Sequence, residues 1–370
     1  MKHLHRLLWL SASLVCLPAL RINIVDLPPY MAPIVADRRV SITDVPAHNT
    51  YGYVHYQSEQ VFLRSLVADR NTYEPDPEAA DLFLVPMWSV MTTYHGGGAA
   101  VIVNMENRIM YLNSTEPHAS RWARRGGTDH VFWAAGDQGA CGLSAAHGSV
   151  IVSEFGDVRC TTVNSVVVPA TLEESMDAEY TATLASLEER STLFFFSGQV
   201  GTGAYSQGVR RAVFDTFNST DGFRLVDSAV ERMDMVSFMQ SMRRSQFCLA
   251  PSGSGFGVRI VYAAVAGCIP VVIQDGVRQP FDDVMDYWDF SISLRFEDIP
   301  RLDNILGKVT PTKAQHMRRH LRGAAKNFLW RTREDGVGMA YETALRALQR
   351  RVYSISTRSV RIGCDQRMSP

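Results

Sequence analysis

This sequence lacks an excess of charge of either sign: 37 Lys and Arg residues stand against 38 Asp and Glu residues, and the formal net charge is -1. Nucleic-acid-binding domains usually carry a basic surplus, so we expect no nucleic-acid partner. The sequence also lacks low-complexity tracts and internal repeats, and 46% of its residues are hydrophobic, which excludes disordered and fibrous classes. A chain of 370 residues with this composition can form two compact domains.

Cysteine pairs with CxxC spacing are absent, as is any cluster of His and Cys that would suggest zinc, and we expect no bound metal. Five cysteines lie outside the N-terminal segment, an odd number that cannot all pair within the chain: Cys141, Cys160, Cys248, Cys268 and Cys364. Cys141 and Cys160 flank a glycine-containing segment and can form a disulfide in an oxidising compartment. Cys248 and Cys268 lie within apolar strand patterns and are predicted to be packed thiols.

The uncharged N-terminal run, residues 7–20, is shorter than the ~20 residues that a membrane-spanning helix needs. A short basic segment precedes it, so residues 1–20 match a signal peptide or a short signal anchor. This predicts the lumen of the secretory pathway, free or anchored to its membrane, and a buried N-terminal helix is the alternative. The sequons at Asn113 and Asn218 agree weakly with lumenal exposure.

Short apolar segments alternate with helical patterns along the chain, an order that predicts parallel sheets covered by helices. In the first half we predict strands at 22–25, 82–86, 130–134, 150–152 and 166–168, and helices at 58–68 and 101–112. In the second half we predict strands at 193–196, 223–226, 247–250 and 269–273, and helices at 208–216, 234–241, 311–330 and 336–353.

Two such series predict the α/β class, with two Rossmann-like domains facing a central cleft beyond the carboxyl ends of their strands. Residues 21–190 are predicted to form the N-terminal domain, including a connection rich in Glu, Thr and Ser at 170–190. Residues 191–353 are predicted to form the C-terminal domain, and residues 354–370 a loose polar tail.

The stretch 245–275 combines an apolar strand, a Gly/Ser turn, the start of a helix and a second apolar strand. In such a unit the backbone N–H groups of the turn and the helix dipole face an anion, and a diphosphate is the natural occupant. The glycines let the backbone approach phosphates, the serines can donate hydrogen bonds, and the arginine can form paired hydrogen bonds. A tight turn whose arginine pairs with a surface carboxylate is the alternative. The predicted contacts are Ser252, Gly253, Ser254, Gly255, Gly257 and Arg259.

Motifs along almost the whole chain resemble the exostosin-like glycosyltransferases. Each motif is weak alone, but their number and order are typical of that family. In the first half they are residues 25–29, 72–86, 122 and 127–132. In the second half they are residues 195–198, 245–249, 267–271 and 279–281.

The resemblance implies a GT-B architecture, a nucleotide-sugar donor (most often a UDP-sugar) held mainly by the C-terminal domain, and inverting transfer. It also implies a glycan or glycoprotein acceptor in the Golgi apparatus and a hetero-complex with another glycosyltransferase as one form of assembly. No cofactor is required, because loop amides and an arginine replace the cation used by transferases with a DxD motif.

One position departs from the family pattern, because Tyr262 stands where many members carry an acid. If that acid normally holds the donor ribose, the nucleotide contacts must differ here. A catalytically inactive scaffold partner of another glycosyltransferase is therefore the alternative. A Rossmann-type oxidoreductase is disfavoured, since the glycine-rich turn lacks G-x-G-x-x-G spacing.

Inverting transfer needs a base for the acceptor hydroxyl and stabilisation of the departing diphosphate. We predict Asp137 as the base, because a short turn places it after the strand 130–134. Asp26, at the end of the first strand, is the second candidate, with helix capping or loop support as its alternative role. Asp129 and His130 match a family motif and are predicted to serve packing or a buried hydrogen bond.

Three residues complete the predicted donor site in the second domain. Gly198 follows the first strand of that domain, and Arg210 lies on the next helix, where a solvated surface position is the alternative. Asp275 closes the last strand of the unit 245–275. Its carboxylate can either bind sugar hydroxyls or cap the turn that follows.

Overall fold

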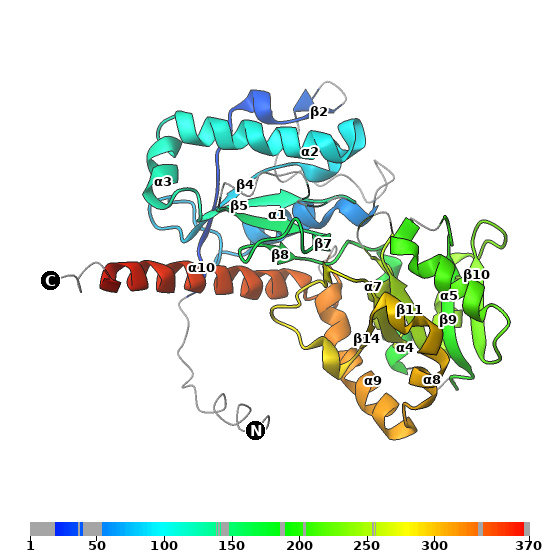
Figure 1. Cartoon of the computed structure of the whole chain (residues 1–370). Coiled ribbons are helices and arrows are strands. Elements are labelled where there is room, and N and C mark those ends of the chain that lie inside the picture. Colours follow the sequence, from blue (N-terminus) through cyan, green and yellow to red (C-terminus); the bar gives the residue numbers. More distant parts are fainter. Residues whose placement is uncertain are drawn as a thin grey trace.

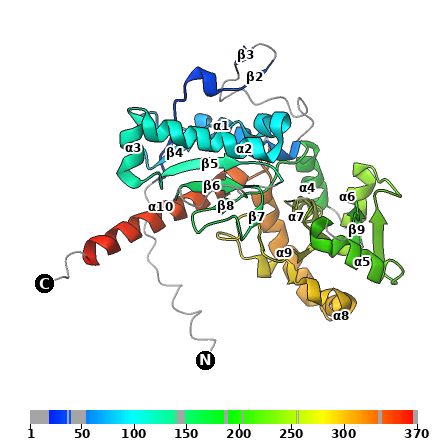
Figure 2. The same cartoon turned by 45° about the horizontal axis from the view of Figure 1, so that its top comes forward.

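The computed structural model describes residues 19–35, 38–39, 54–137, 139, 141, 148–185, 189–202, 205–253, 255, 257–331 and 336–365. Of the predicted targeting segment, only Ala19 and Leu20 fall within these residues. Figures 1 and 2 show two α/β lobes, with a long C-terminal helix running along the side of the first lobe.

The first lobe is a parallel sheet whose strands, in the described residues, have the order β1-β4-β5-β6-β8. The strands are β1 (Ile22–Ile24), β4 (Leu82–Val85), β5 (His130–Ala134), β6 (Val150–Ser153) and β8 (Val166–Val167). The helices that follow them in the first lobe are α1 (Ser58–Ala68), α2 (Ser89–Ser114) and α3 (His118–Arg125). Helix α2 covers one face of this sheet and the C-terminal helix lies across the other (Figure 1).

The second lobe repeats the pattern with a parallel sheet in the order β10-β9-β11-β12-β14. Its strands are β9 (Thr192–Gly198), β10 (Phe223–Asp227), β11 (Ser245–Pro251), β12 (Ile269–Ile273) and β14 (Ile292–Leu294). Its helices are α4 (Ser175–Ala185), α5 (Val209–Phe217), α6 (Met235–Arg243), α7 (Arg259–Val265), α8 (Leu302–Gly307) and α9 (Pro311–Ala325). The predicted class of two Rossmann-like α/β domains, the GT-B arrangement, is confirmed.

Strand β9 shows why an unbroken apolar run becomes an interior strand. Side chains alternate between the two faces of a sheet, and helices cover both faces of a parallel sheet. Phe195 packs in the core shared with α6 and α7, whereas Phe194 and Phe196 pack in the core shared with α5 and α8. The three rings are each no more than 2% exposed, so the run is buried on both sides.

The two lobes are joined by backbone pairing as well as by the chain. Strand β7 (Gly156–Asp157) of the first lobe pairs antiparallel with β13 (Val277–Arg278), which follows β12 of the second. A Cβ atom at Gly156 would lie 2.2 Å from the Arg278 carbonyl oxygen, so the pairing needs glycine there. Just beyond β13, Phe281 is fully buried in the core of the first lobe.

The C-terminal helix α10 (Ala340–Asp365) differs from its prediction in both length and packing. The predicted loose tail at 354–370 is helical as far as Asp365, because no proline or glycine interrupts the segment before Gly363. The buried side of α10 packs in the first core through Ala340, Tyr341, Ala344, Ala347 and Leu348, although the helix follows the second lobe in sequence. Conversely, α4 lies within the predicted connection 170–190 and packs on the second lobe.

Helix α2 begins twelve residues before its predicted start, at Ser89 instead of residue 101. Glycines at 96–98 weaken the helical pattern in the sequence. Tertiary contacts override that weakness, because the buried carboxylate of Glu59 accepts hydrogen bonds of 2.6, 3.1 and 2.6 Å from the N–H groups of Met87, Trp88 and Ser89. These groups stand at the start of the helix, where backbone N–H groups have no acceptor within the helix itself.

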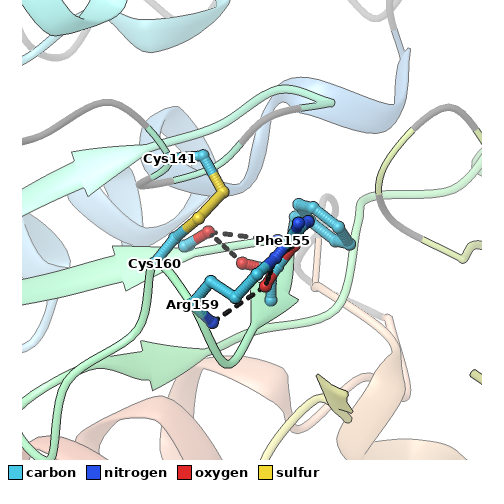
Figure 3. The surroundings of a disulfide bond; sticks show 6 residues. Cys141, Phe155, Arg159 and Cys160 are labelled. Carbon is cyan, nitrogen blue, oxygen red and sulfur yellow. Dashed lines mark hydrogen bonds and ion pairs between the residues drawn. A yellow bond between two sulfur atoms is a disulfide. The ribbon is translucent and has the colours of Figure 1, made fainter. Parts of the chain in front are cut away.

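Two disulfides are present among the described residues. The predicted bond between Cys141 and Cys160 is confirmed (Figure 3). The prediction that Cys248 and Cys268 are unpaired packed thiols is wrong, since they too form a disulfide. Cys248 lies on β11 and Cys268 directly precedes β12, and the two adjacent strands bring the Cα atoms to 5.8 Å, within the range of a disulfide.

Candidate active site between the two sheets

The loops that follow β5 and β11 touch at the junction of the two lobes. Gly255, in the glycine-rich loop after β11, packs against Asp137, in the loop after β5: a Cβ atom at Gly255 would lie 1.5 Å from the Asp137 carbonyl oxygen. Only glycine allows this approach. The predicted base and the predicted phosphate loop are therefore brought together, although the close approach of Gly255 is to the first lobe and not to a ligand.

Asp137 is held in place from both sides of its loop. The Tyr56 hydroxyl donates a hydrogen bond of 2.5 Å to Asp137 Oδ1, while the residue remains exposed. Two residues later, Gly139 lies against β6, since a Cβ atom there would lie 2.2 Å from a serine hydroxyl of that strand. The disulfide between Cys141 and Cys160 then ties the loop to the turn after β7 (Figure 3). This carboxylate is both accessible and oriented, as a proton acceptor must be.

A buried acid beside Asp137 was missed in the sequence. Glu154 directly follows β6 and is 4% exposed; its Oε1 accepts a hydrogen bond of 2.5 Å from the Ser58 hydroxyl, which accepts one of 2.9 Å from the Trp133 indole. Burial raises the pKa of Glu154 to about 8, and the negative charge of Asp137 adds to the rise. Its position directly after a predicted parallel strand could have marked Glu154 as a candidate site residue. The sequence alone does not distinguish a buried acid from an exposed one.

Two arginines of the second lobe lie together at the carboxyl end of β9. A Cβ atom at Gly198 would lie 3.0 Å from Arg259 Nη2 and 3.5 Å from Arg210 Nη1. Burial, together with the positive charge of Arg210, lowers the pKa of Arg259 to about 10. The structure thus brings together three of the predicted donor-site residues, Gly198, Arg210 and Arg259, at the carboxyl end of β9.

Arg210 is fixed by the backbone around it. Its guanidinium donates hydrogen bonds of 2.9 Å to the carbonyl oxygen of Gln199 and of 2.7 Å to that of Ser252. The side chain is 6% exposed, so the alternative of a solvated helix position does not hold. Arg259 lies on α7, where its guanidinium packs over the ring of Phe238 at 4.8 Å.

No carboxylate of the described residues forms an ion pair with either arginine. Arg210 is buried and Arg259 is partly exposed, and two neighbouring charges of the same sign in such surroundings are costly without a counter-ion. An anion that receives hydrogen bonds from Arg259 would remove that cost. The pair can therefore accept a phosphate-like group at the carboxyl edge of the second sheet.

The rest of the glycine-rich loop is placed mainly by protein contacts. Ser252 is buried and its carbonyl oxygen accepts the Arg210 bonds, whereas Gly253 is partly exposed. Ser254 lies outside the described residues. At Gly257 a Cβ atom would lie 2.8 Å from Gln274 Nε2. Helix α7 has only seven residues, so the arginines supply more positive charge here than the helix dipole does.

The two remaining predicted residues make other contacts. Asp275 follows β12 and its Oδ2 accepts a hydrogen bond of 3.0 Å from the N–H of Phe296, so one oxygen serves the start of the 3₁₀ helix Phe296–Arg301. Asp26 is exposed, and its described electrostatic neighbours are Tyr111 and His118 on the outer helices of the first lobe. Asp129 and His130 form the expected buried hydrogen bond, at 2.9 Å.

Tyr262, the departure from the family pattern, points its hydroxyl at a carboxylate. The hydroxyl donates a hydrogen bond of 2.9 Å to Glu173 Oε2, on the segment that connects the lobes. Tyr262 is 4% exposed and Glu173 is partly exposed. Helix α7 therefore lacks an acid at this position, but an acid from another segment lies beside it.

The fold places an arginine pair without an ion-pair partner among the described residues on one lobe and an oriented carboxylate on the facing loop of the other, the arrangement of a protein with two Rossmann-like sheets. This chain belongs to the exostosin GT47 family, whose domain model (Exostosin GT47 domain) matches residues 17–309.

Plant proteins are among the relatives. The chain is 28% identical over 281 residues to a probable glucuronosyltransferase of Oryza sativa subsp. japonica, covering 69% of this chain and 64% of that protein. It is 27% identical over 282 residues to a probable beta-1,4-xylosyltransferase of Arabidopsis thaliana, covering 70% of this chain and 66% of that protein. The chain thus spans just under two thirds of the length of these relatives.

Among solved structures, the chain is similar to AviGT4, a glycosyltransferase involved in avilamycin A biosynthesis. The sequence identity is 14%, the coverage is 90% of this chain and 98% of that chain, and the TM-score is 0.36. At this TM-score the similarity adds nothing to the topology described above.

Two further features bear on ligands and location. Among the described residues, one group of metal-ligating side chains lies close together, Cys141, Asp157 and Cys160. Both cysteines are in the disulfide, and Asp157 forms an ion pair with Arg159 at 2.5 Å. Within the same part of the chain, no helix has the length and apolarity needed to cross a membrane.

The raised pKa of Glu154 predicts a pH dependence of stability. Between pH 4.5 and about 8, Glu154 is protonated in the folded protein but ionised in the unfolded chain. The free energy of unfolding therefore falls as the pH rises through this range. Glutamine mimics the protonated acid and does not ionise. We expect Glu154→Gln to be more stable than wild type at about pH 8, by on the order of 1 kcal/mol or more, and similar at about pH 5. Denaturant unfolding at both pH values, with the exposed Glu106→Gln as control, tests this; equal pH dependence in all three proteins would contradict it.

The arginine pair predicts that a methyl group at Gly198 interferes with anion binding. The three atoms nearest to a Cβ atom there belong to the side chains of Arg259, Phe196 and Arg210, at 3.0, 3.2 and 3.5 Å, and the end of the Arg259 side chain can shift, so Gly198→Ala should fold normally. We expect the Kd for UDP, measured by calorimetry, to rise about tenfold. Gly323→Ala is the matched control, since a Cβ atom there meets nothing within 4 Å. Unchanged UDP affinity in Gly198→Ala would place the nucleotide elsewhere.

Proposed function

We propose that this chain is an inverting glycosyltransferase that moves a sugar from a nucleotide-sugar donor, a UDP-sugar, to a glycan or glycoprotein acceptor. The observation that carries this function is the pair Arg210 and Arg259, whose charge no described carboxylate neutralises. The diphosphate of a sugar nucleotide is the ligand whose charge and size suit it. Family membership and the names of the relatives support sugar transfer.

The residues around the junction divide the chemistry between the two lobes. Arg259 binds the diphosphate and stabilises the charge that develops as the sugar leaves. Arg210 adds to that charge and holds the loop through Ser252. Asp137, on the facing loop, accepts the proton of the acceptor hydroxyl as its oxygen attacks the anomeric carbon. Attack from the side opposite the diphosphate inverts that carbon.

The names of the relatives and the N-terminal segment support a class of sugar and a compartment. The relatives in rice and Arabidopsis carry names of glucuronosyl and xylosyl transfer, so we infer a glucuronosyl or pentosyl donor. The N-terminal segment and the sequons support a place in the Golgi lumen, free or anchored to the membrane, since Asn113 and Asn218 are both exposed. No cofactor is needed in this scheme, because the arginines supply the positive charge at the diphosphate.

Two variants test the division of roles. Because Arg259 contacts the donor, Arg259→Ala should raise the KM for the donor and lower kcat, with a loss in kcat/KM of about 10² to 10³. Because Asp137 acts only on the acceptor, Asp137→Asn should lower kcat by about 10² or more and leave the donor Kd unchanged. Nucleotide release from a panel of UDP-sugars, with glycan acceptors, measures both.

Arg295→Ala serves as the control, because the Arg295 side chain is exposed and its ion-pair partner is Glu297, which is not part of the proposed site. If the wild-type protein neither releases nucleotide nor gains thermal stability with any nucleotide, the proposed function is wrong.

The contact between Tyr262 and Glu173 suggests how the donor is held without an acid on α7. We infer that Glu173, oriented by the Tyr262 hydroxyl, accepts hydrogen bonds from the donor ribose. Glu173→Gln should then raise the donor KM about tenfold, and Tyr262→Phe should have a smaller effect in the same direction. The exposed neighbour Glu174→Gln is the control. Equal donor KM values in Glu173→Gln and Glu174→Gln would remove Glu173 from the site.

A catalytically inactive scaffold for another glycosyltransferase is the second candidate function. Two observations favour it: Tyr262 replaces the family acid, and Gly255 in the predicted phosphate loop is covered by Asp137. A scaffold would keep its biological role in the double variant Arg259→Ala, Asp137→Asn, whereas an enzyme would lose it. Complementation with this double variant separates the two functions.

A further inference from the structure

A groove lies at the junction of the lobes, and neither arginine of the pair lines it. It has a volume of about 700 Å³, within the range of sites that hold small organic ligands. Its lining comes from two segments after β12, residues 276–279 and 282–288, with Val158 from the first lobe. Val158 and Gly276 are joined by a backbone hydrogen bond of 2.9 Å, which closes one side of this groove.

The groove carries an indole that faces solvent. Asp286 caps a short 3₁₀ helix, η5 (Tyr287–Asp289), by accepting a hydrogen bond of 3.2 Å from the N–H of Trp288. Tyr287 turns inward, and its hydroxyl donates a hydrogen bond of 2.7 Å to the carbonyl oxygen of Pro280. Trp288 consequently turns outward and is 77% exposed.

This exposure is unusual for a tryptophan of this chain. The other tryptophans of the described residues are at most 7% exposed: Trp88, Trp122, Trp133 and Trp330. An indole left in water beside a groove offers a flat apolar face with a polar edge. Pyranose rings present flat C–H faces edged by hydroxyl groups, and they match such a surface.

The polar groups of the groove limit the charge of its ligand. Asp282 is paired with Arg278 at 2.8 Å, and Asp283 is paired with Arg351 of α10. Asp286 takes part in no ion pair among the described residues, and the residues that line the groove carry three carboxylates and one guanidinium, that of Arg278. Arg350, outside the lining, donates a hydrogen bond to the Asp283 carbonyl oxygen, so the surplus of negative charge belongs to the lining itself. Carboxylates and the amide of Gln279 suit hydroxyl donors and acceptors, whereas an anionic sugar would be repelled.

We propose that this groove binds a neutral oligosaccharide, as a docking site for a segment of the glycan acceptor away from the reacting hydroxyl. The groove begins at Gly276, directly after Asp275 at the carboxyl end of β12, so a chain lying in it can extend toward the candidate active site. The inference rests on the proposed function for its choice of a glycan. The ring of Trp288 stacks on one pyranose, and Asp286 and Gln279 hydrogen-bond hydroxyl groups beside it.

Measuring the binding of oligosaccharides to the full chain, in the absence of nucleotide, tests this site. The probes are xylohexaose and cellohexaose as neutral chains and hexagalacturonic acid as an acidic one, measured by calorimetry and by tryptophan fluorescence. We expect saturable binding of a neutral chain, protection of the exposed indole from acrylamide quenching, and a Kd raised about tenfold by Trp288→Ala. Trp288→Phe should retain part of the affinity. Tyr30→Ala, an aromatic residue that is 68% exposed outside the groove, should bind as wild type.

The negative charge of Asp286 allows a second test of the groove. Asparagine can still cap η5, so Asp286→Asn should keep the fold and narrow the preference for neutral over acidic chains. Absence of binding by both neutral probes, or equal affinity in wild type and Trp288→Ala, overturns the inference. Arg259→Ala should weaken UDP binding and leave oligosaccharide binding unchanged. A failure of the proposed groove can therefore be distinguished from a failure of the proposed donor site.

Discussion

Backbone from one lobe touches backbone from the other at two glycines, and the geometry of both candidate ligand sites depends on these contacts. At Gly156 the contact permits the pairing of β7 with β13, and at Gly255 it seats the glycine-rich loop against Asp137. A side chain at either position would force the lobes apart. The distance between the facing carboxyl edges of the two sheets therefore depends on the missing Cβ atoms of Gly156 in the first lobe and Gly255 in the second.

Charge is distributed unevenly across that junction. The second lobe presents Arg210 and Arg259 without a counter-ion among the described residues, while the first presents Asp137 with the protonated Glu154 beside it. A positive edge facing a negative one suits a ligand whose leaving group is anionic and whose attacking group must lose a proton. Burial raises the pKa of Glu154 to about 8 and so disfavours a second negative charge beside Asp137 at neutral pH.

The sequence was informative where local pattern and tertiary environment agree. The strands and most of the helices follow from apolar runs bounded by turn residues. The choice of Asp137, in a loop, and of Arg259, at the start of α7, follows from the rule that sites lie beyond parallel strands. Helix α2 was predicted too short because Glu59, thirty residues away, stabilises its start. The disulfide of Cys248 and the carboxylate that meets Tyr262 depend on which segments become neighbours, and no spacing in the sequence encodes that. Burial of Glu154 was invisible for the same reason.

Helix α10 supplies part of the first core although it is the last element of the chain. During synthesis, the sheet assembled from residues 22–167 must therefore wait, with an apolar surface uncovered, until the ribosome has made the whole second lobe. The usual order, in which an N-terminal domain is finished before its successor emerges, does not apply to such a chain. Premature termination between residues 328 and 340 would leave both lobes made but the earlier one without its covering helix, and so exposed to chaperones and to aggregation.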